Sequence, residues 1–222
     1  MAETVTGEIA KQIPVAGLVE QYAAEFTSVL PAHIGQERYV RWCLTFLRAA
    51  VKGKQAEAWG RVLASPNGQL SVMHALMECA TLGLEPGRTY HLVPFKDEVT
   101  GITDYKGEIE LIYRAGPFPV VADLVYERDE FVFKGGNVPP LHDADWFDDR
   151  GAVAGGYAYC QLGPQLYTQV VRMSEDTFLH HRDKSLTKTH TIWDEWPEQM
   201  RLKTLVHQLR KYAPWSIEVR HP

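Results

Sequence analysis

The sequence has few cysteines and no long apolar run, and each absence excludes a class of protein. Its three cysteines, Cys43, Cys79 and Cys160, are far apart and set among apolar residues, so they fit neither a disulfide framework nor a zinc site. No apolar stretch is long enough to cross a bilayer. The N-terminal segment lacks the basic and apolar regions of a secretory signal. We therefore expect a protein of a reducing, cytoplasmic compartment with no membrane partner.

The common catalytic and nucleotide-binding motifs are missing as well. The Gly53-Lys54 pair lacks the upstream glycine and the following serine or threonine of a phosphate-binding P-loop. None of GxSxG, HExxH and CxxC occurs in the sequence. The sequence therefore gives no support for ATP-driven chemistry or for the common hydrolase reactions.

The chain does have a globular composition with an uneven charge distribution. It is 45% hydrophobic and 23% charged, and its net charge of −5 at first argues against a polyanionic partner. Residues 122–150, however, hold eight acidic residues against three basic ones, so the rest of the chain is close to neutral. Residues 199–215 hold four basic residues and no acid. Since a polyanion responds to the local field, this basic stripe matters more than the net charge.

Hydrophobic periodicity predicts helices at both ends of the chain and strands between them. The predicted helices cover residues 36–51, 65–83, 106–116 and 197–212. In the second helix Leu70 is expected to face inward, and residues 96–101 are expected to form a polar turn. Residues 117–173 are rich in Val, Tyr and Phe separated by turn residues, which is typical of antiparallel strands. The predicted fold class is α+β, a mostly antiparallel sheet packed with long helices.

The chain shows no convincing linker. We expect residues 1–35 to form an N-terminal arm that contacts a neighbouring subunit, and residues 36–222 to form a single α+β domain.

The closing helix carries a basic column beside its apolar stripe. Lys203, His207 and Arg210 stand at i, i+4 and i+7, within roughly 60° of one another around the helix. Two readings are open: the solvated face of an amphipathic helix, or one wall of a groove for phosphates. The spacing alone favours the first.

A second cation stands at an unusual position. Lys106 lies at the start of a predicted helix, where free amides and the helix dipole favour an anion and slightly disfavour a cation. Either an anionic ligand or a nearby carboxylate, Glu108 or Glu110, would balance it. Pattern alone does not choose between them.

Aromatic residues are interleaved with these bases and can stack on nucleobases. The candidates are Tyr105, Trp193 and Trp196, with Tyr113, Tyr212 and Trp215 nearby. Most aromatics at such spacing belong to a core, and the pattern favours that reading.

The acidic segment offers a different chemistry. Asp143, Asp145, Asp148 and Asp149 could bind a divalent cation, as in a metal-dependent nuclease, but the segment reads more simply as a polar surface loop. Besides a phosphate-binding groove and a metal-dependent nuclease, a third alternative is an assembly protein that does not bind DNA.

Four stretches in order carry a family resemblance. They are "ALMECATLGLEPG", "YHLVPF", "DYKGEIELIYRAG" and "WPEQMRLKTLVHQLRKYAPWS", and together they span roughly residues 70–217. In this order they resemble the RecT family of phage and prophage recombinases, which is related to the Redβ single-strand annealing proteins.

The resemblance implies a protein that binds single-stranded DNA without ATP and anneals complementary strands in phage homologous recombination. It also implies a homo-oligomer, as a ring or helical filament, acting in the cytoplasm of a bacterial host, and no enzyme activity. The α+β core would form a basic groove, making residues 36–222 one DNA-binding and annealing domain. No cofactor is implied, although magnesium is compatible with annealing. The implied partners are single-stranded and annealed duplex DNA, a partner exonuclease and the host single-strand-binding protein.

By motif match, Lys106 takes the position of the family's basic residue after the tyrosine, and Lys203 and Arg210 take the basic positions of the closing helix. The resemblance raises the groove reading above the solvated one. The remaining DNA-binding candidates are His207, Arg201, Lys211 and Arg114, and the base-stacking candidates are Tyr105, Trp193 and Trp196.

Overall fold

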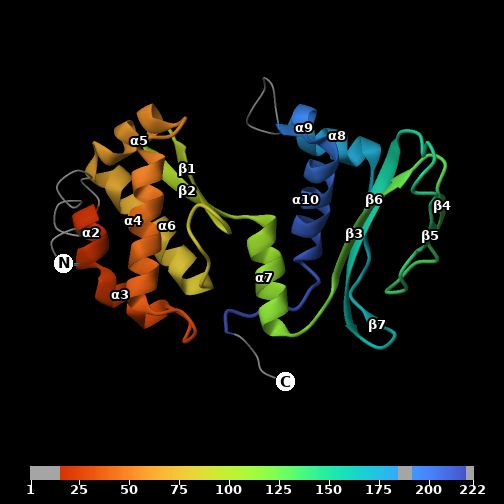
Figure 1. The fold of residues 1–222 in the computed structure, drawn as a ribbon, viewed down its shortest axis with the longest axis horizontal. Helices are drawn as coiled ribbons and strands as arrows, with labels where there is room; N and C mark the ends of the chain where they lie inside the picture. Colours follow the sequence, from red (N-terminus) through yellow and green to blue (C-terminus); the bar gives the residue numbers. More distant parts are fainter. Residues whose placement is uncertain (1–15, 185–191, 219–222) are drawn as a thin grey trace. The chain divides into compact units, whose positions relative to one another are not determined.

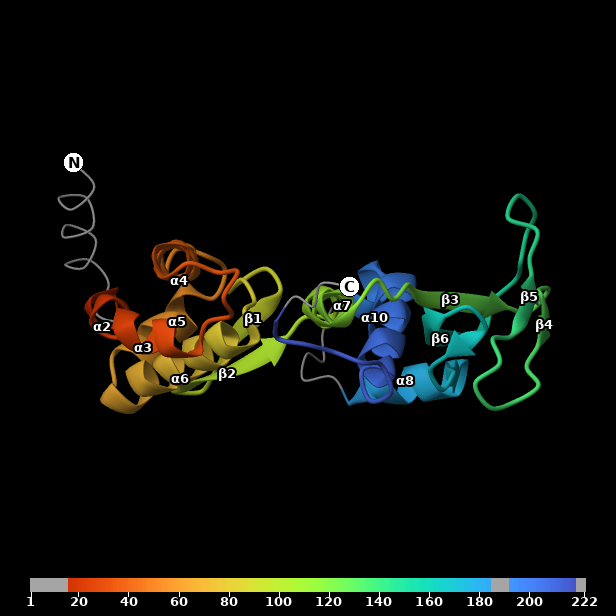
Figure 2. The same ribbon diagram turned by 90° about the horizontal axis from the view of Figure 1, so that it is seen from below.

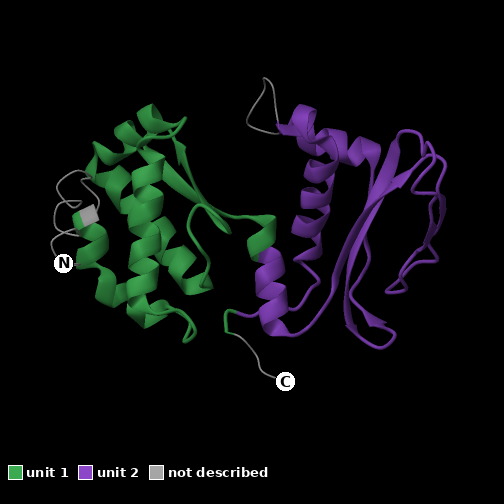
Figure 3. Cartoon of the chain, in the orientation of Figure 1, with its two compact units in different colours: residues 1–107, 217–219 green, residues 108–216, 220–222 purple. Residues whose placement is uncertain are grey.

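The computed structural model describes residues 16–184 and 192–218 (Figure 1). The chain forms two compact units (Figure 3). Unit 1 is Met1–Gly107 with Ile217–Val219, and unit 2 is Glu108–Ser216 with Arg220–Pro222. The boundary falls inside helix α7 (Tyr105–Ala115), so Lys106 and the closing helix belong to different units.

Unit 1 is built from helices and one hairpin. Its described elements are α2 (Ala16–Gln21), α3 (Ala23–Val29), α4 (Gln36–Ala50), α5 (Ala56–Leu63), α6 (Pro66–Leu82), β1 (Tyr90–Phe95) and β2 (Glu98–Thr103). Helix α6 contacts α3, α5 and both strands, so it is the central element of the unit.

Helix α6 begins and ends where its sequence signals predict. The Ser65 hydroxyl accepts a hydrogen bond from the Gly68 amide at 3.0 Å, and Pro66 occupies the first turn. Gly83 ends the helix in the left-handed conformation, φ 61°. These caps confirm the predicted span of 65–83.

The inward face of α6 differs from the prediction at Leu70. Leu70 is 50% exposed, so its assignment to the core is wrong. The buried residues of the helix include Val72, Met73, Leu76, Cys79 and Ala80, so the expected inward positions Met73 and Ala80 are confirmed. Three-to-four-residue spacing from Val72 fits the observed face, whereas Leu70 is rotated away from it.

The predicted polar turn over 96–101 is also too long. Strand β2 starts at Glu98 and pairs with β1 in an antiparallel hairpin, from Phe95 opposite Glu98 to Tyr90 opposite Thr103. Only Lys96 and Asp97 connect the strands, with Lys96 at φ 55°. The β-branched residues of β2 favour an extended strand despite its polar start.

Unit 2 is a sheet covered by helices. Its described elements are β3 (Val120–Tyr126), β4 (Glu130–Val132), β5 (Leu141–Asp143), β6 (Val153–Gly163), β7 (Leu166–Tyr167), β8 (Val171–Ser174), α8 (Glu175–Asp183), α9 (Ile192–Glu195) and α10 (Pro197–Leu209). The long strand β6 pairs antiparallel with β3, β7 and β8. Strands β4 and β5 form a separate antiparallel hairpin.

The two faces of the β3–β6–β8 sheet are covered by different elements. On one face, Leu124 and Ala158 pack with Leu205 and Leu209 of α10. Because side chains alternate along a strand, Val125 lies on the other face, in a cluster that Phe131 of β4 joins. Figures 1 and 2 show α10 and the β4–β5 hairpin on opposite sides of β3 and β6.

These elements confirm the predicted α+β class, with antiparallel sheets and long helices. Within residues 16–184 and 192–218, no helix is both long and apolar enough to cross a bilayer. Residues 1–15 of the predicted arm lie outside the described residues, while α2 and α3 bury Val19 and Phe26. The compactness of the two units does not test the functional division at residue 35, which stays a prediction.

Candidate nucleic-acid interface

Helix α10 lies close against the sheet of unit 2. Its apolar side is fully buried at Leu205 and Leu209. Gly156 of β6 permits this approach, since a Cβ atom there would lie 2.9 Å from the Leu205 Cδ1 atom. The close packing fixes which side of α10 remains available to a ligand.

The three predicted basic residues of α10 lie beside this packed side. Lys203, His207 and Arg210 are all half-buried, and Arg210 forms the C-terminal cap of the helix. The helix itself is shorter than predicted, ending at Leu209 rather than residue 212. The basic column predicted from the spacing therefore lies on one continuous helical element.

A buried carboxylate sets the environment of this column. Glu108 of α7 has a side chain only 4% exposed. His207 Nδ1 lies 2.8 Å from Glu108 Oε2, a close polar contact that lacks the geometry of a well-directed hydrogen bond. Arg210 Nη1 lies 3.5 Å from Glu108 Oε1, and its guanidinium carbon lies 6.0 Å from the Trp215 ring centroid. Glu108 thus contacts two candidate DNA-binding side chains and offsets part of the Arg210 charge.

The role of Glu108 was not predicted from sequence, where it was weighed only as a partner for Lys106. Glu108, Leu111 and Ile112 stand at i, i+3 and i+4, and all three are buried. A carboxylate on the apolar stripe of a helix needs a cationic partner, because an unpaired buried charge is costly. The position of Glu108 on this apolar stripe was the sequence feature from which its burial and its need for a cationic partner could have been predicted.

Lys106 lies in the first turn of α7 and its side chain is exposed. Its amide donates to Asp104 Oδ1 at 3.0 Å, so the buried Asp104 caps the helix. Asp104 Oδ2 also lies 3.2 Å from His91 Nε2. The ammonium group lies 5.9 Å from the Tyr105 ring centroid. Asp104 therefore accepts a hydrogen bond from a free amide at the start of the helix, and the Lys106 side chain is exposed to solvent.

Two further candidates have their charge balanced inside the fold. Arg201 makes a bidentate ion pair with Glu175 of α8, and hydrogen bonding to that carboxylate raises the pKa of the guanidinium. Arg114 is 6% exposed and lies 2.5 Å from Glu110 of its own helix. Both arginines stabilise the local packing of unit 2, and their assignment to DNA stays a prediction.

The last candidates differ in exposure. Lys211 is exposed, and its ammonium group donates to Gln208 Oε1 at 2.6 Å. Trp193 is 7% exposed and belongs to the core beneath α10, whereas Trp196 is 57% exposed. Of the two tryptophans, Trp196 therefore presents a ring to solvent. The assignment of Trp193, Trp196 and Tyr105 to base stacking stays a prediction.

These residues do not all belong to one unit. Lys106 and Tyr105 lie in unit 1, and the α10 residues lie in unit 2. The expectation that Lys106 and α10 line one basic groove stays a prediction.

Three of the four aspartates of the alternative metal site accept hydrogen bonds from backbone amides. Asp145 accepts from the Phe147 amide at 3.0 Å, Asp148 from the Asp149 amide at 2.8 Å, and Asp149 from the Gly151 amide at 2.9 Å. In the described part of the chain, no group of three or more His, Cys, Asp or Glu side chains is arranged to hold a metal ion. Asp143 ends strand β5, and the other three aspartates lie in a polar loop that these hydrogen bonds stabilise.

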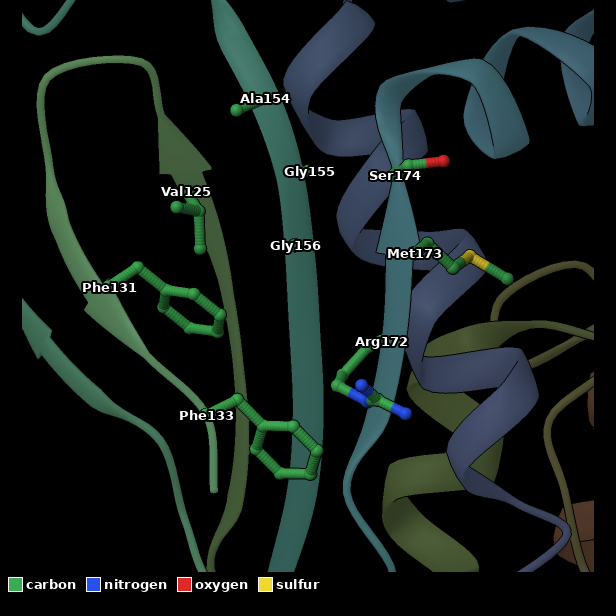
Figure 4. A pocket seen from close by; sticks show the side chains of 9 residues that line it. All are labelled: Val125, Phe131, Phe133, Ala154, Gly155, Gly156, Arg172, Met173 and Ser174. Carbon is green, nitrogen blue, oxygen red and sulfur yellow. The ribbon is translucent and has the colours of Figure 1, made fainter. Parts of the chain in front are cut away.

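A cavity of about 470 Å³ lies on the sheet face opposite α10 (Figure 4). Phe131 and Phe133 line one side, and Arg172 lies over the Phe133 ring, with its guanidinium carbon 4.2 Å from the centroid. Gly155 and Gly156 of β6 also line it. None of the predicted DNA-binding residues lines this cavity.

A family model and a curated relative both match most of this chain. The model of the family described as "RecT family" matches residues 46–221. The chain is 30% identical over 208 residues to "Protein RecT" of Escherichia coli (strain K12), which covers 88% of this chain and 73% of that protein. The matched region contains α7 and α10, with Lys106, Glu108 and the basic column.

Proposed function

The chain belongs to the RecT family, and from this premise we propose that it binds single-stranded DNA and anneals complementary strands without ATP. Strand pairing would take place on a homo-oligomer during phage homologous recombination. A partner exonuclease and the host single-strand-binding protein are proposed partners on the same basis.

The observation that best supports this proposal is the basic column of α10. Lys203 and His207 lie on one packed helix and Arg210 caps it, all within the family match, in a chain of net charge −5. Regularly spaced cations on a fixed helix suit the regular spacing of phosphates, and such contacts carry no sequence information. Annealing needs this kind of binding, because the protein must accept any sequence.

No covalent chemistry is required for the reaction. Two single strands repel each other through their phosphates, and cations that neutralise one strand release its counterions and reduce the repulsion. A strand held with its base edges accessible can then sample register against a second strand. Duplex stacking, about 1.4 kcal/mol per step, supplies the driving force. The protein lowers the barrier to forming the first paired run.

Repetition of the site along an oligomer would strengthen binding. Each copy contributes a modest affinity, and contact by one copy raises the effective concentration of the strand at the next. Lys106 would add a phosphate contact from unit 1, where Asp104 caps the helix and leaves the ammonium group exposed.

The test is annealing of two complementary labelled oligonucleotides without ATP, with and without magnesium. We expect paired strands of unchanged length to form faster than without protein. Strands that bind but do not pair would contradict annealing. Shortening of either label with magnesium or manganese would indicate a nuclease, and absence of binding at low salt would favour a non-DNA assembly protein.

A further inference from the structure

The β4–β5 arm, residues 130–149 of unit 2, carries a large share of the exposed apolar side chains. In the part of the chain that the structure describes, fourteen large hydrophobic residues are exposed, and five of them lie on this arm. They are Val132, Val138, Leu141, Trp146 and Phe147. Exposed apolar side chains concentrated on one segment of a folded protein are typical of an interaction surface.

The outward face of the arm is also acidic. Val132 lies opposite Leu141, and Glu130 lies opposite Asp143, with all four residues exposed. Like charges directly opposite each other on a hairpin are destabilising. No cation among the described residues pairs with Glu130 or Asp143. A cationic surface placed against this face would relieve the repulsion and cover the apolar pair.

The inward side of the arm is held firmly. The Asp129 carboxylate, 1% exposed, receives the Arg150 guanidinium at 2.6 Å and lies 3.0 Å from His142 Nε2. Phe131 packs on Tyr157 of β6, with ring centroids 5.6 Å apart. The outward face is therefore presented on an ordered scaffold, and docking would cost little conformational entropy.

The same chain offers a surface of matching chemistry. Helix α4 of unit 1 exposes Arg41 and Arg48 along one face, with the small residues Thr45 and Ala49 beside them, and Lys52 is exposed in the turn that follows the helix. Within the described residues, no ion pair engages these three cations. The aliphatic stems of arginine and lysine can cover apolar side chains while their charged ends reach carboxylates.

We infer that the β4–β5 arm of one copy docks on the basic face of α4 in a second copy of this chain. The contact joins two different surfaces, so it is heterologous, and its repetition generates a ring or a filament. The inference rests on the proposed function, for which it names the surfaces that assemble the oligomer.

Two charge-reversed variants test this contact. In the arm variant, Glu130→Lys and Asp143→Lys give both surfaces a positive charge. In the helix variant, Arg41→Glu and Arg48→Glu make both surfaces negative. All four positions are exposed, so the fold should tolerate the changes. We expect each variant alone to self-associate with a dissociation constant raised about tenfold or more, as measured by sedimentation velocity without DNA.

Mixing the two variants supplies the decisive result. Every reversed arm then meets a reversed helix, and every native arm meets a native helix, so the equimolar mixture should assemble as an alternating oligomer. The matched control, Glu25→Lys with Glu57→Lys, makes the same charge change at exposed positions of α3 and α5 and should assemble like the unchanged chain.

Three results would overturn the inference: no self-association by the unchanged chain, self-association of either variant as tight as that of the unchanged chain, or a mixture that stays dissociated. Annealing by the unchanged chain is measured in parallel. A failed annealing assay with the mixing pattern intact would refute the proposed function and leave the docking contact standing.

Discussion

At the scale of single residues, the cations of α10 differ in how far the fold already uses their charge. Arg201 is committed to Glu175, whereas Arg210 remains 38% exposed and approaches Glu108 only at 3.5 Å. A guanidinium that contacts a buried carboxylate only loosely can still donate hydrogen bonds to a phosphate oxygen. Arg210 is therefore the residue on which a phosphate contact can be tested most directly.

We expect Arg210→Ala to weaken binding of single-stranded oligonucleotides about equally for all sequences. Loss of one phosphate contact should lower the slope of log affinity against log salt by about 0.7. Fluorescence anisotropy at several salt concentrations measures both effects. Arg88→Ala is the control, because Arg88 is a 76% exposed arginine of unit 1. A loss confined to particular sequences would argue against backbone recognition.

The substitution Glu108→Gln tests two opposite effects of Glu108 on DNA binding: it orients Arg210, and its negative charge repels a bound phosphate. Orientation of Arg210 by Glu108 is worth on the order of 1 kcal/mol of side-chain entropy. A carboxylate roughly 7 Å from a bound phosphate repels it by about 2 kcal/mol at an effective dielectric constant of about 20. The electrostatic effect is larger, so we expect the variant to bind DNA several-fold more tightly at low salt.

The same substitution should lower the free energy of unfolding by about 1–2 kcal/mol, because His207 and Arg210 lose a buried anionic partner. Urea unfolding measures the change. Glu57→Gln, at a 91% exposed position, should alter neither property. Weaker DNA binding by Glu108→Gln would show that orientation outweighs repulsion.

Asp129 gives the fold a defined response to acid. Hydrogen bonding from the Arg150 guanidinium holds the pKa of this carboxyl well below its ordinary value. A lowered pKa in the folded state stabilises the protein above the unfolded-state value of about 3.9, and this stabilisation is lost as the pH falls toward the folded-state value. We therefore expect the free energy of unfolding to fall steeply below about pH 4.

Asp129→Asn should be less stable at pH 7 by about 3 kcal/mol and should lose much of this pH dependence. Urea unfolding between pH 7 and pH 3 tests both expectations. Asp145→Asn, at an exposed position of the same segment, is the control. A variant whose stability fell as steeply as that of the unchanged chain below pH 4 would assign the acid response to other groups.

At the scale of elements, the start of α7 depends on a glycine. A Cβ atom at Gly107 would lie 2.3 Å from the Thr89 carbonyl oxygen and 3.2 Å from Leu84 Cδ1. Gly107→Ala must displace backbone, so we expect a loss of about 1–3 kcal/mol in urea unfolding. Gly60→Ala in α5 is the matched control. No atom lies within 4 Å of its added methyl group, so it should be neutral or stabilise by up to about 1 kcal/mol. Equal effects at the two positions would contradict the close approach.

Elements with strong local signals were predicted well from sequence. Helix α6 has a serine cap, a proline in its first turn and a terminal glycine, and each acts within a few residues. Strand β5 was missed, because Leu141–Asp143 lies in an acidic stretch and becomes a strand only by pairing with β4. The prediction of a turn over residues 96–101 was wrong for a similar reason, because β2 is defined by its pairing with β1.

In the candidate site too, features set by local sequence could be predicted and features set by long-range contacts could not. The common face of Lys203, His207 and Arg210 depends only on helical spacing and could be predicted. The partner of Arg210 lies 102 residues earlier in the chain, so no local pattern could identify Glu108 as that partner. The burial of Glu108 could have been predicted from the apolar stripe of its own helix, whereas the identity of its partners could not have been predicted.

At the scale of the whole molecule, an acidic protein is proposed to bind a polyanion. The net charge is −5, yet fields from exposed charges decay over a Debye length of about 8 Å at physiological ionic strength. At that salt concentration, an acid far from the interface should hardly affect a bound strand. Local cations should then decide affinity, and net charge should matter only at low salt.

We therefore expect Glu25→Lys with Glu57→Lys to change oligonucleotide affinity less than twofold at about 0.15 M salt, although it shifts the net charge by four. Lys203→Ala changes the net charge by one and should weaken binding about tenfold under the same conditions. At about 0.01 M salt, where the Debye length is about 30 Å, the first variant should bind measurably more tightly than the unchanged chain. Affinities that followed net charge at both salt concentrations would mean that the strand responds to the average field of the protein and would refute a localised basic interface.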